Sequence, residues 1–379
     1  MGADAAAVPR DAPGLGLRTR WKLWRNRRLS DPGFHRWTSR IPVLRTIAAR
    51  ESAAVFDLCA GFVYSQVLLA CVESGVLRAL DGVVLGTADI ARVAGLPDAA
   101  TDRLLSAAAA LRLVEPVGER RWVLGPRGAA VIGVASIEPM VRHHRLLYDD
   151  LRDPLQLLRG GIGTRLGRYW SYAGGGDGGA SDVADYSQLM AVSQELVAAD
   201  VIDAYPFARH ARLLDVGGGE GAFVQAVARR VPGLALGLYD LPPVAARARE
   251  RCDASGLATR IEINAGDFRR DPLPAGYDLV SLVRVLHDHD DDVALALLES
   301  IRAVLPPGGV CLVAEPMSGQ RGAEAMADAY FGFYLLAMGQ GCARSPARIA
   351  ELARRAGFVS AEHRPTRRPL FASLVELRA

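Results

Sequence analysis

Strands and helices alternate regularly from Arg212 onward, and this succession constrains the fold more than any other feature of the chain. The apolar strand candidates are Arg212–Val216, Ala235–Tyr239, Ile261–Asn264, Leu279–Val285 and Val310–Glu315. The helices expected between and after them are Phe223–Arg230, Pro243–Gly256, Asp290–Val304 and Ser345–Ala356. A repeated strand–helix–strand order predicts an α/β fold with a doubly wound, mostly parallel sheet, whose carboxyl edge holds the ligand crevice.

The first strand leads through a glycine-rich turn into a helix, over the sequence Leu213-Leu-Asp-Val-Gly-Gly-Gly-Glu-Gly-Ala-Phe223. Glycines permit a tight turn and let a ligand approach the backbone closely. Gly217, Gly219 and Ala222 fit the pattern GxGxxA, which dinucleotide-binding proteins also carry. The turn by itself therefore leaves NAD and other adenosyl cofactors open.

Acidic residues near the strand ends distinguish between these cofactors. Asp215 lies two residues before the first glycine, where its carboxylate would attract a cation and repel a pyrophosphate. Asp240 follows the second strand, 21 residues after Gly219, and is placed to accept hydrogen bonds from ribose hydroxyls. Asp267 follows the third strand and could accept a hydrogen bond from an adenine amino group, with Phe268 against the ring. Three acids at successive strand ends favour S-adenosylmethionine, which carries a sulfonium and an ammonium group.

Four motifs resemble those of class I S-adenosylmethionine-dependent methyltransferases, in particular the O-methyltransferase family that includes plant caffeate and flavonoid enzymes. They are Asp215-Val-Gly-Gly-Gly219, Tyr239-Asp-Leu-Pro242, Gly266-Asp-Phe268 and Leu286-His-Asp-His289. The resemblance extends over residues 52–379 and implies a Rossmann-like methyltransferase domain with S-adenosylmethionine as cofactor. Leu241 and Arg284 join the acids, the glycines and Phe268 as the predicted cofactor-binding residues.

A histidine follows the fourth strand of the predicted sheet. His287 lies at the carboxyl end of that strand, where it can act as a general base on a substrate hydroxyl while its oxygen attacks the sulfonium methyl. The resemblance implies that Glu315, at the end of the next strand, hydrogen-bonds this histidine and fixes its tautomer. Family members often carry a second glutamate before an Arg-Thr pair. This chain has Ala343 there, so a second orienting acid is in question.

The run His287-Asp-His-Asp-Asp-Asp292 also invites interpretation as a metal site. We expect no metal, because these acids are suited to the N-terminus of a helix, where the dipole favours negative charge. No second cluster of metal-ligand residue types stands out elsewhere in the sequence.

An apolar and aromatic segment after Glu315 is expected to line the substrate pocket, together with residues from 140–190. Its large members are Met326, Tyr330, Phe331, Phe333, Tyr334, Leu335 and Met338. Most side chains at such helical spacing pack in a core, so only some are expected to touch substrate. The predicted substrate-contacting residues are Met190, Tyr330, Tyr334, Met338 and His144. This lining predicts a hydrophobic small-molecule substrate.

Residues 51–135 follow a winged-helix pattern. A long helix over Ala53–Ser74 precedes two shorter helices, Thr87–Gly95 and Asp98–Leu111, and then a short hairpin. Winged helices can bind DNA, but Asp98–Leu111 carries only Arg103 as a basic residue, whereas a recognition helix needs several basic and amide side chains. We therefore expect no nucleic-acid partner. The family resemblance implies instead that this region forms a homodimer and helps to close the substrate pocket.

Residues 1–50 differ from the rest. From Arg10 to Arg50 there are eleven Lys or Arg and two acids, with three tryptophans among them. This composition fits an ordinary solvated arm that packs its tryptophans on the body, and it fits nearly as well an arm that contacts an anionic membrane surface. Nucleic-acid-binding segments share it too, but that interpretation is the weakest of the three. The predicted organisation is an arm over 1–50, a helical and winged-helix dimerisation and lid domain over 51–172, a Gly-rich linker over 173–180 and a catalytic domain over 181–379.

Composition restricts the location of the protein. The chain is 50% hydrophobic and 23% charged, with a net charge of +3, which is typical of a soluble globular protein. Five scattered cysteines without a CxxC pair argue against a disulfide framework and fit a reducing cytosol. We expect a cytoplasmic protein that can contact the inner or photosynthetic membrane through residues 10–50. The longest apolar stretch, Ala53–Val72, contains polar residues, and we expect a buried helix there instead of a membrane span.

Two N-terminal segments narrow the resemblance. Trp24-Arg-Asn-Arg-Arg28 and Phe56-Asp-Leu-Cys-Ala-Gly-Phe-Val-Tyr-Ser-Gln-Val67 are similar to the bacterial 1-hydroxycarotenoid O-methyltransferases of purple photosynthetic bacteria. The resemblance implies methylation of the tertiary 1-hydroxyl of a long acyclic carotenoid, in biosynthesis of the spheroidene or spirilloxanthin type. Other acceptors stay open, namely a polyketide or aromatic phenol and a tetrapyrrole carbon. A winged-helix regulator that senses S-adenosylmethionine and an NAD-dependent oxidoreductase are alternatives from other classes, and Asp215 argues against the second.

Overall fold

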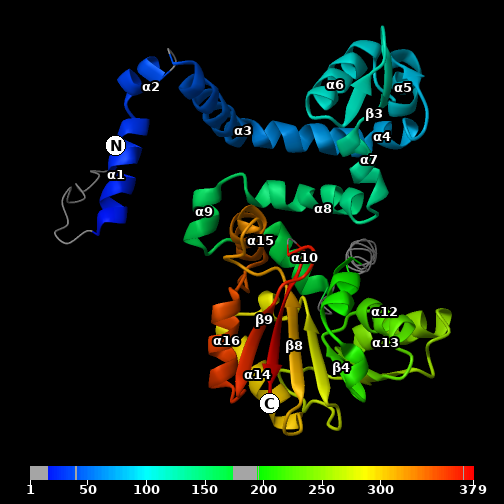
Figure 1. Cartoon of the computed structure of the whole chain (residues 1–379). Coiled ribbons are helices and arrows are strands. Elements are labelled where there is room, and N and C mark those ends of the chain that lie inside the picture. Colours follow the sequence, from blue (N-terminus) through cyan, green and yellow to red (C-terminus); the bar gives the residue numbers. More distant parts are fainter. Residues whose placement is uncertain (1–15, 39–40, 174–193, 195, 370) are drawn as a thin grey trace.

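The computed structural model describes residues 16–38, 41–173, 194, 196–369 and 371–379 (Figure 1). Within these residues, an α/β body with a central sheet carries the C-terminal half of the chain, and helices with a small sheet form the N-terminal half. An arm of helices extends sideways from the N-terminal half.

A seven-stranded sheet forms the centre of the α/β body. Its strands are β4 (Arg212–Val216), β5 (Ala235–Asp240), β6 (Ile261–Ala265), β7 (Leu279–Val283), β8 (Val310–Glu315), β9 (Ser360–Arg364) and β10 (Ser373–Arg378). The spatial order is β6-β5-β4-β7-β8-β10-β9, and β10 runs antiparallel to both of its neighbours. The chain starts centrally, moves outward to β6 and returns beside β4, so β4 and β7 flank the switch point where ligands bind in such folds. The predicted doubly wound, mostly parallel sheet is confirmed.

Helices cover both faces of this sheet. They are α12 (Ala222–Arg230), α13 (Pro242–Ala254), α14 (Asp291–Val304), α16 (Pro346–Arg355) and a helical segment over 196–204, which a short 3₁₀ turn, η1 (Phe207–Arg209), follows. One apolar core packs α14 and α16 against the sheet, and a second packs 196–204, α12 and α13 against the opposite face. Strand residues such as Leu282 are fully buried between these layers. Each such leucine contributes about 1.5–3 kcal/mol to folding, which fixes the sheet edge that positions the site.

The predicted strands β4 to β8 all exist, and their bounds differ little from those expected. The expected strand Leu279–Val285 ends earlier, at Val283, because Arg284 adopts a left-handed φ of 59° that a continuing strand cannot accommodate. Neither β9 nor β10 was predicted from the sequence. β9 is mostly polar and charged, and Glu376 interrupts the apolar residues of β10, so neither shows the apolar run that marks the other strands.

The N-terminal half contains α4 (Val76–Ala79), α5 (Thr87–Ala94), α6 (Asp98–Ala110), α7 (Pro126–Gly133), α8 (Ile137–Asp150), α9 (Pro154–Arg159) and α10 (Arg165–Ala173). The three-stranded sheet beside α5 and α6 is formed by β1 (Leu85–Gly86), β2 (Val114–Pro116) and β3 (Arg121–Leu124), in the order β1-β3-β2. Helix, helix and hairpin follow one another as the winged-helix pattern predicted. The first helix after the sheet, α7, leads into α8, which lies above the α/β body in Figure 1.

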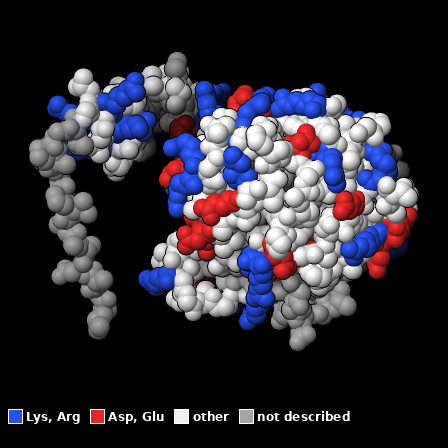
Figure 2. Space-filling model, turned by 90° about the horizontal axis from the view of Figure 1, so that it is seen from below, with Lys and Arg blue, Asp and Glu red and all other residues white. Residues whose placement is uncertain are grey.

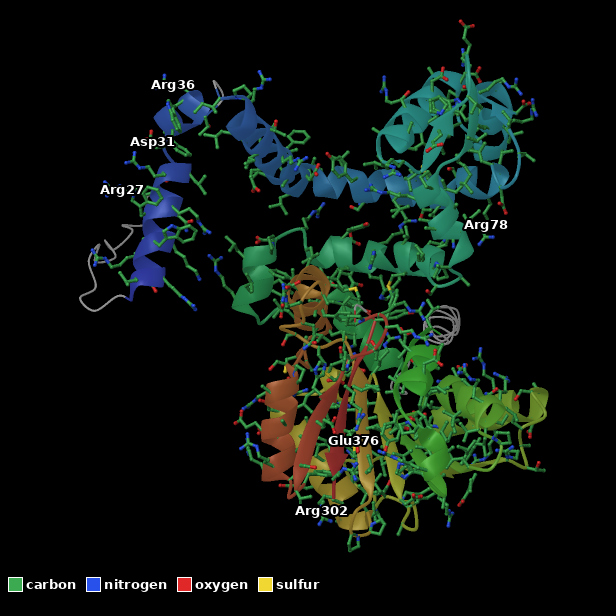
Figure 3. The ribbon with its side chains drawn as sticks, viewed as in Figure 1. Arg27, Asp31, Arg36, Arg78, Arg302 and Glu376 are labelled. Carbon is green, nitrogen blue, oxygen red and sulfur yellow. The ribbon has the colours of Figure 1, made fainter. Side chains whose placement is uncertain are left out.

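The arm consists of α1 (Leu17–Leu29), α2 (Pro32–Thr38) and the long α3 (Pro42–Glu73), shown in Figure 1 as a chain of helices reaching away from the body. Trp21, Trp24 and Trp37 are each more than half exposed. The interpretation of this segment as an arm that packs its tryptophans on the body is therefore wrong. Figure 3 labels Arg27 and Arg36 on this arm, well apart from the α/β body. The predicted domain boundary at residue 50 lies inside α3, and the predicted linker lies almost entirely outside the described residues.

The expectation of a buried helix over Ala53–Val72 is wrong for most of its length. Leu58 is 85% exposed and Phe62 is 73% exposed, and burial begins only near Leu69. In length and composition, residues 44–73 would suffice to cross a membrane, and 17% of the most apolar window is buried. The sequence correctly indicates an apolar helix, but the described chain supplies apolar neighbours only to its C-terminal end.

Candidate active site

A cavity of about 680 Å³ opens at the carboxyl ends of β4 and β7, between the α/β body and the helices above it. The glycine turn after β4 and the segment after β7 form one side of it. The opposite wall comes from α8, α10, η3 (Ala325–Tyr330), which is a π-helix, and α15 (Phe331–Met338). A π-helix is uncommon and frequently occurs at functional sites. The cavity thus lies at the edge that the strand order predicted.

The glycine turn has the geometry that requires glycine at its first position. Gly217 adopts a φ of 69°, and a Cβ there would lie 2.8 Å from Val285 Cγ2. The Gly217 N–H donates to the carbonyl of Tyr239, which ties the turn to β5. Any side chain at this position would therefore strain the backbone and push against the segment after β7.

Asp215 is completely buried beneath the glycine turn. Its Oδ1 accepts a hydrogen bond of 2.6 Å from Ser281 Oγ, and its Oδ2 has no hydrogen-bond partner among the described residues. Burial raises the pKa of Asp215 to about 7, and this outweighs the opposing effect of the Ser281 hydrogen bond. A buried acid with an unused acceptor oxygen is a polar group that a cationic ligand nearby would stabilise.

The other predicted acids also lie around the cavity. Asp240 accepts hydrogen bonds from the N–H groups of Gly219 and Leu241, both at 2.7 Å, and so holds the turn next to the start of α13. Since a carboxylate offers about four lone pairs, two remain for ribose hydroxyls. Asp267 accepts from the N–H of Arg269 at 3.0 Å and lines the cavity next to Phe268. Burial raises the pKa of Asp240.

Arg284 is placed in the cavity wall by an unusual backbone. Its φ of 59° lies in a region that residues other than glycine rarely occupy, and its N–H still donates to Ala314 O on β8 at 2.8 Å. This turn directs the chain from β7 into the cavity wall. Together with Gly217, Gly219, Asp240, Leu241, Asp267 and Phe268, Arg284 lines the cavity, as predicted for the cofactor site, whereas Asp215 lies behind the turn.

These residues fit an adenosyl cofactor with positive charge. The glycine turn leaves space that a side chain would fill, and buried Asp215 has an unused oxygen beneath it. Two acceptors on Asp240 and the aromatic Phe268 suit ribose and adenine. A pyrophosphate would instead find the acids Asp240 and Asp267 on this side of the cavity.

His287 lies in a 3₁₀ turn, η2 (Leu286–Asp288), directly after β7, and is 5% exposed. Its backbone N–H donates to Glu315 Oε2 at 3.0 Å, and its Nδ1 lies 3.5 Å from the same oxygen, longer than an ordinary hydrogen bond. Its Nε2 lies 3.1 Å from Asp288 Oδ1, and its ring packs against Phe331. The family resemblance implied that Glu315 lies beside His287, whereas the contact of His287 with Asp288 was not predicted.

The surroundings of His287 decide its charge. Burial alone would lower the pKa of this imidazole, but Asp288 and Glu315 outweigh it and raise the pKa to about 9. His287 is therefore a cation at neutral pH in this arrangement, and loss of the contact between its Nε2 and Asp288, or a cationic ligand close by, would lower its pKa and make it a base at lower pH. A buried histidine between two carboxylates, facing a cofactor-sized cavity, has the chemistry of a proton acceptor.

The remaining acids of the HDHDDD run serve the next helix. Asp290 is the N-cap residue of α14, and Asp291 and Asp292 lie in its first turn, as predicted. Within the part of the chain that the structure describes, no group of three or more His, Cys, Asp or Glu side chains could hold a metal ion. His289 packs edge-on against Phe268, with ring centroids 5.3 Å apart.

Three of the five predicted substrate residues line the cavity: Tyr330, Tyr334 and Met338. His144 is placed behind them, and its Nε2 lies 2.8 Å from Tyr330 Oη. Met190 lies outside the described residues. The structure adds Met140 on α8, which lies within the predicted range 140–190 but was not singled out there, one helical turn before His144. Leu335 and Phe331 lie nearby and make this wall apolar and aromatic.

The fold and the cavity define a Rossmann-like methyltransferase with an accessory winged-helix region. Residues 161–359 match the O-methyltransferase domain family. The chain is 43% identical over 378 residues to demethylspheroidene O-methyltransferase of Cereibacter sphaeroides, covering 98% of this chain and 97% of that enzyme. The enzyme of the same name from Rhodobacter capsulatus is 41% identical over 346 residues, covering 90% and 86%. Among solved structures, mitomycin 7-O-methyltransferase superposes with a TM-score of 0.73 at 26% identity, covering 88% of this chain and 99% of that one.

The chain therefore belongs to the O-methyltransferase family, and it is an S-adenosylmethionine-dependent O-methyltransferase that acts on a small molecule. The predicted family, fold class, enzyme class and cofactor are confirmed. The individual site residues stay predictions that their geometry supports.

Proposed function

We propose that this enzyme methylates the tertiary 1-hydroxyl group of an acyclic carotenoid, with His287 as the general base. The observation that carries this proposal is the placement of His287: it faces the same cavity as the glycine turn, opposite an apolar and aromatic wall. The relatives named for demethylspheroidene support the substrate class, because they align over nearly the whole of this chain.

S-adenosylmethionine supplies an electrophilic methyl group when bound. For the chain itself, Asp240 would hold the ribose, Asp267 and Phe268 the adenine, and buried Asp215 would stabilise positive charge from beneath the turn. Leu241 and Arg284 complete that side of the cavity. These residues would orient the cofactor in the cavity, and orientation of this kind accounts for a large part of catalysis in transfer reactions.

A tertiary alcohol is a weak acid, so its proton must leave as the new bond forms. His287 Nε2 would take this proton, in the position that Asp288 now occupies beside it. Glu315 accepts from the His287 backbone and lies next to Nδ1, so it holds the ring and stabilises the imidazolium that forms. With Ala343 at the position of the second family glutamate, Asp288 and Glu315 are the two carboxylates that contact the ring.

The test is methyl transfer from labelled S-adenosylmethionine to 1-hydroxyneurosporene in detergent, with His287→Ala beside the wild type. Loss of a general base lowers turnover by about 10²- to 10⁴-fold while cofactor binding persists. His363→Ala is the control, because His363 lies exposed on β9, outside the lining of the cavity. Full activity of His287→Ala would refute the base. A wild type that binds cofactor but transfers nothing to the carotenoid would refute the substrate, leaving phenol or tetrapyrrole acceptors.

We further infer that the protein forms a homodimer through α3. A helix that is apolar on all sides needs an apolar environment, and Val55, Phe56, Leu58 and Phe62 are exposed along it. A second copy of the same helix provides such a surface. In sedimentation experiments, we expect Phe62→Glu to shift the protein towards the monomer. Val359→Glu, at an exposed valine of the α/β body, is the matched control and is expected to leave the dimer intact.

We also propose that α1 contacts an anionic membrane surface. It carries six Lys or Arg and no acid, and Trp21 and Trp24 are exposed beside them. Figure 2 shows Lys and Arg on the projecting arm. Indole rings prefer the headgroup region, and basic residues gain energy near anionic lipid. Vesicles containing phosphatidylserine should co-sediment the full-length protein, and Trp21→Ala combined with Trp24→Ala should weaken this. Equal sedimentation of both proteins would refute the contact.

A further inference from the structure

A buried arginine forms hydrogen bonds with the backbone of the turn that carries His287. Arg344 is 2% exposed and is the largest fully buried side chain in the described part of the chain. Its Nη1 donates to Leu286 O at 2.7 Å, and its Nη2 donates to His289 O at 2.7 Å. These carbonyls flank His287 on either side in the sequence, so one planar group fixes both ends of the turn.

The charge of this arginine is compensated locally. Arg344 Nε donates to Asp291 Oδ1 at 2.8 Å, at the start of α14. A buried guanidinium is tolerated only where it is paired and its donors are used, and here three of them have acceptors with good geometry. The ion pair therefore connects the His287 turn to the first turn of α14, which the sheet holds in place.

A second contact comes from the same segment. Gly341 adopts a φ of 86°, and a Cβ on it would lie 2.3 Å from the carbonyl oxygen of His287. Its N–H donates to Asp290 Oδ1 at 2.9 Å. The backbone at Gly341 is thus in close contact with the turn, and only glycine fits. Ala343, between Gly341 and Arg344, offers no polar side chain, so backbone contact and the guanidinium supply the hold on the turn.

We propose that Arg344, with Gly341, is the positioning residue for the general base in this enzyme. Its role is to fix the 3₁₀ turn so that His287 Nε2 faces the acceptor oxygen. This inference rests on the proposed role of His287. Gly339 and Gln340 line the cavity, so the segment that holds the turn also continues the substrate wall from Met338. The distance between base and acceptor is thereby set by one continuous segment.

Arg344→Lys is the decisive variant. Lysine keeps the positive charge but lacks the planar fork that reaches three acceptors, so the turn loosens while the local charge is preserved. Misplacement of a catalytic group by about 1 Å costs about 10²-fold in rate. We therefore expect kcat to fall by about 10- to 100-fold, with cofactor affinity and the KM for the acceptor changed by no more than about two-fold.

Arg348→Gln is the matched control. Arg348 also pairs with Asp291, at 2.5 Å, but it is partly exposed and its donors reach carboxylates of Asp291 and Glu351. We expect its kcat to stay within about two-fold of the wild type. If Arg348→Gln lowers kcat as much as Arg344→Lys, the effect belongs to the Asp291 ion pair in general, and the proposal is wrong. It is equally wrong if Arg344→Lys keeps wild-type kcat per cofactor-binding site.

Two further measurements keep the test independent of folding yield and of the acceptor. Rates are expressed per bound S-adenosylmethionine. Gly341→Ala, which pushes on the His287 carbonyl, should reproduce the fall in kcat, and an unchanged kcat overturns the proposal.

NMR titration of labelled histidine follows the protonation of His287 without any substrate. Arg344→Lys should move its midpoint downward, because a loosened turn weakens the Asp288 contact, and an unmoved midpoint counts against positioning. A wild type without transfer to hydroxycarotenoid would refute the proposed function instead, and the titration would still apply.

Discussion

The sheet beside the site and helix α3 are both rich in apolar residues, but these residues are buried in the sheet and mostly exposed along α3. Around the site, strand residues such as Leu282 are buried between two layers of helices, and most of the polar residues that line the cavity lie at or after the strand ends. Along α3, Leu58 and Phe62 are exposed over a length that could cross a bilayer. The described residues around the cavity are packed by their own chain, whereas most of α3 has few apolar neighbours among the described residues.

The largest expected effect is on the free energy of unfolding, when a leucine is replaced by alanine either in the sheet or in α3. Leu282→Ala removes a fully buried side chain and should destabilise the fold by about 2–5 kcal/mol. Leu58→Ala removes an 85% exposed side chain and should change the stability of a monomer by less than about 0.5 kcal/mol. Urea denaturation measures both free energies of unfolding.

Protein concentration turns this pair into a test of α3. If α3 meets a second copy, the stability lost in Leu58→Ala grows as the protein is concentrated, because association stabilises only the assembled form. Leu282→Ala should cost the same at every concentration. A Leu58→Ala protein that matches the wild type at all concentrations would mean that α3 is simply an exposed helix.

The rate of methyl transfer should depend on pH through the protonation of His287. With its pKa raised to about 9, His287 is protonated at neutral pH and cannot accept a proton. Below that pKa, kcat/KM of the free enzyme should therefore fall about ten-fold for each unit of pH. Asp288→Asn removes a carboxylate that raises the pKa, so the acid limb should move to lower pH. A rate independent of pH between 6 and 9, roughly the span of this pKa shift, would exclude His287 as the base.

The raised pKa of His287 should also make the folded protein less stable as the pH rises. The ordinary pKa of histidine is 6.5 and the folded value is about 9, so the folded protein binds the proton more tightly. The stabilisation is fully present below about pH 6.5 and disappears as the pH rises through 9. His287→Ala should therefore flatten the fall in unfolding free energy over this range, which thermal unfolding at a series of pH values can measure.

The two regions also show what sequence can predict. Short-range signals were sufficient for β4 to β8, for the glycine turn and for the placement of His287 and Glu315, because strand order alone brings carboxyl ends together. The contacts that tune the base are not of this kind. Asp288 contacts His287, its neighbour in the sequence, and Arg344 lies 57 residues after His287 in the chain. Neither contact is marked by a local sequence pattern.

Burial along α3 could not be predicted for a different reason. Apolar composition indicates that a helix prefers apolar surroundings, but it does not say whether they come from the same chain. The antiparallel strand β10 illustrates a related limit, since pairing with β8 and β9 determines its burial, and Glu376 interrupts its apolar residues. Long-range pairing decides both features.

The smallest expected effect lies where the site meets the helices above it. Tyr330 Oη and His144 Nε2 are 2.8 Å apart, and they join η3 of the α/β body to α8. Burial lowers the pKa of His144, so this ring is neutral and loses an uncharged hydrogen bond when Tyr330 becomes phenylalanine. The net value of such a bond is about 0.5–1.5 kcal/mol.

Because Tyr330 lines the cavity, Tyr330→Phe should raise the KM for the acceptor by about 2- to 10-fold and leave kcat nearly unchanged. Tyr148→Phe is the control, since the Tyr148 ring packs edge-on against the same histidine, with centroids 6.4 Å apart, but from within α8. An equal rise in KM for both variants would place the effect in the packing of α8. A rise confined to Tyr330→Phe would mean that the hydrogen bond between η3 and α8 helps to shape the acceptor pocket, so that the half of the chain that carries α3 contributes to the site.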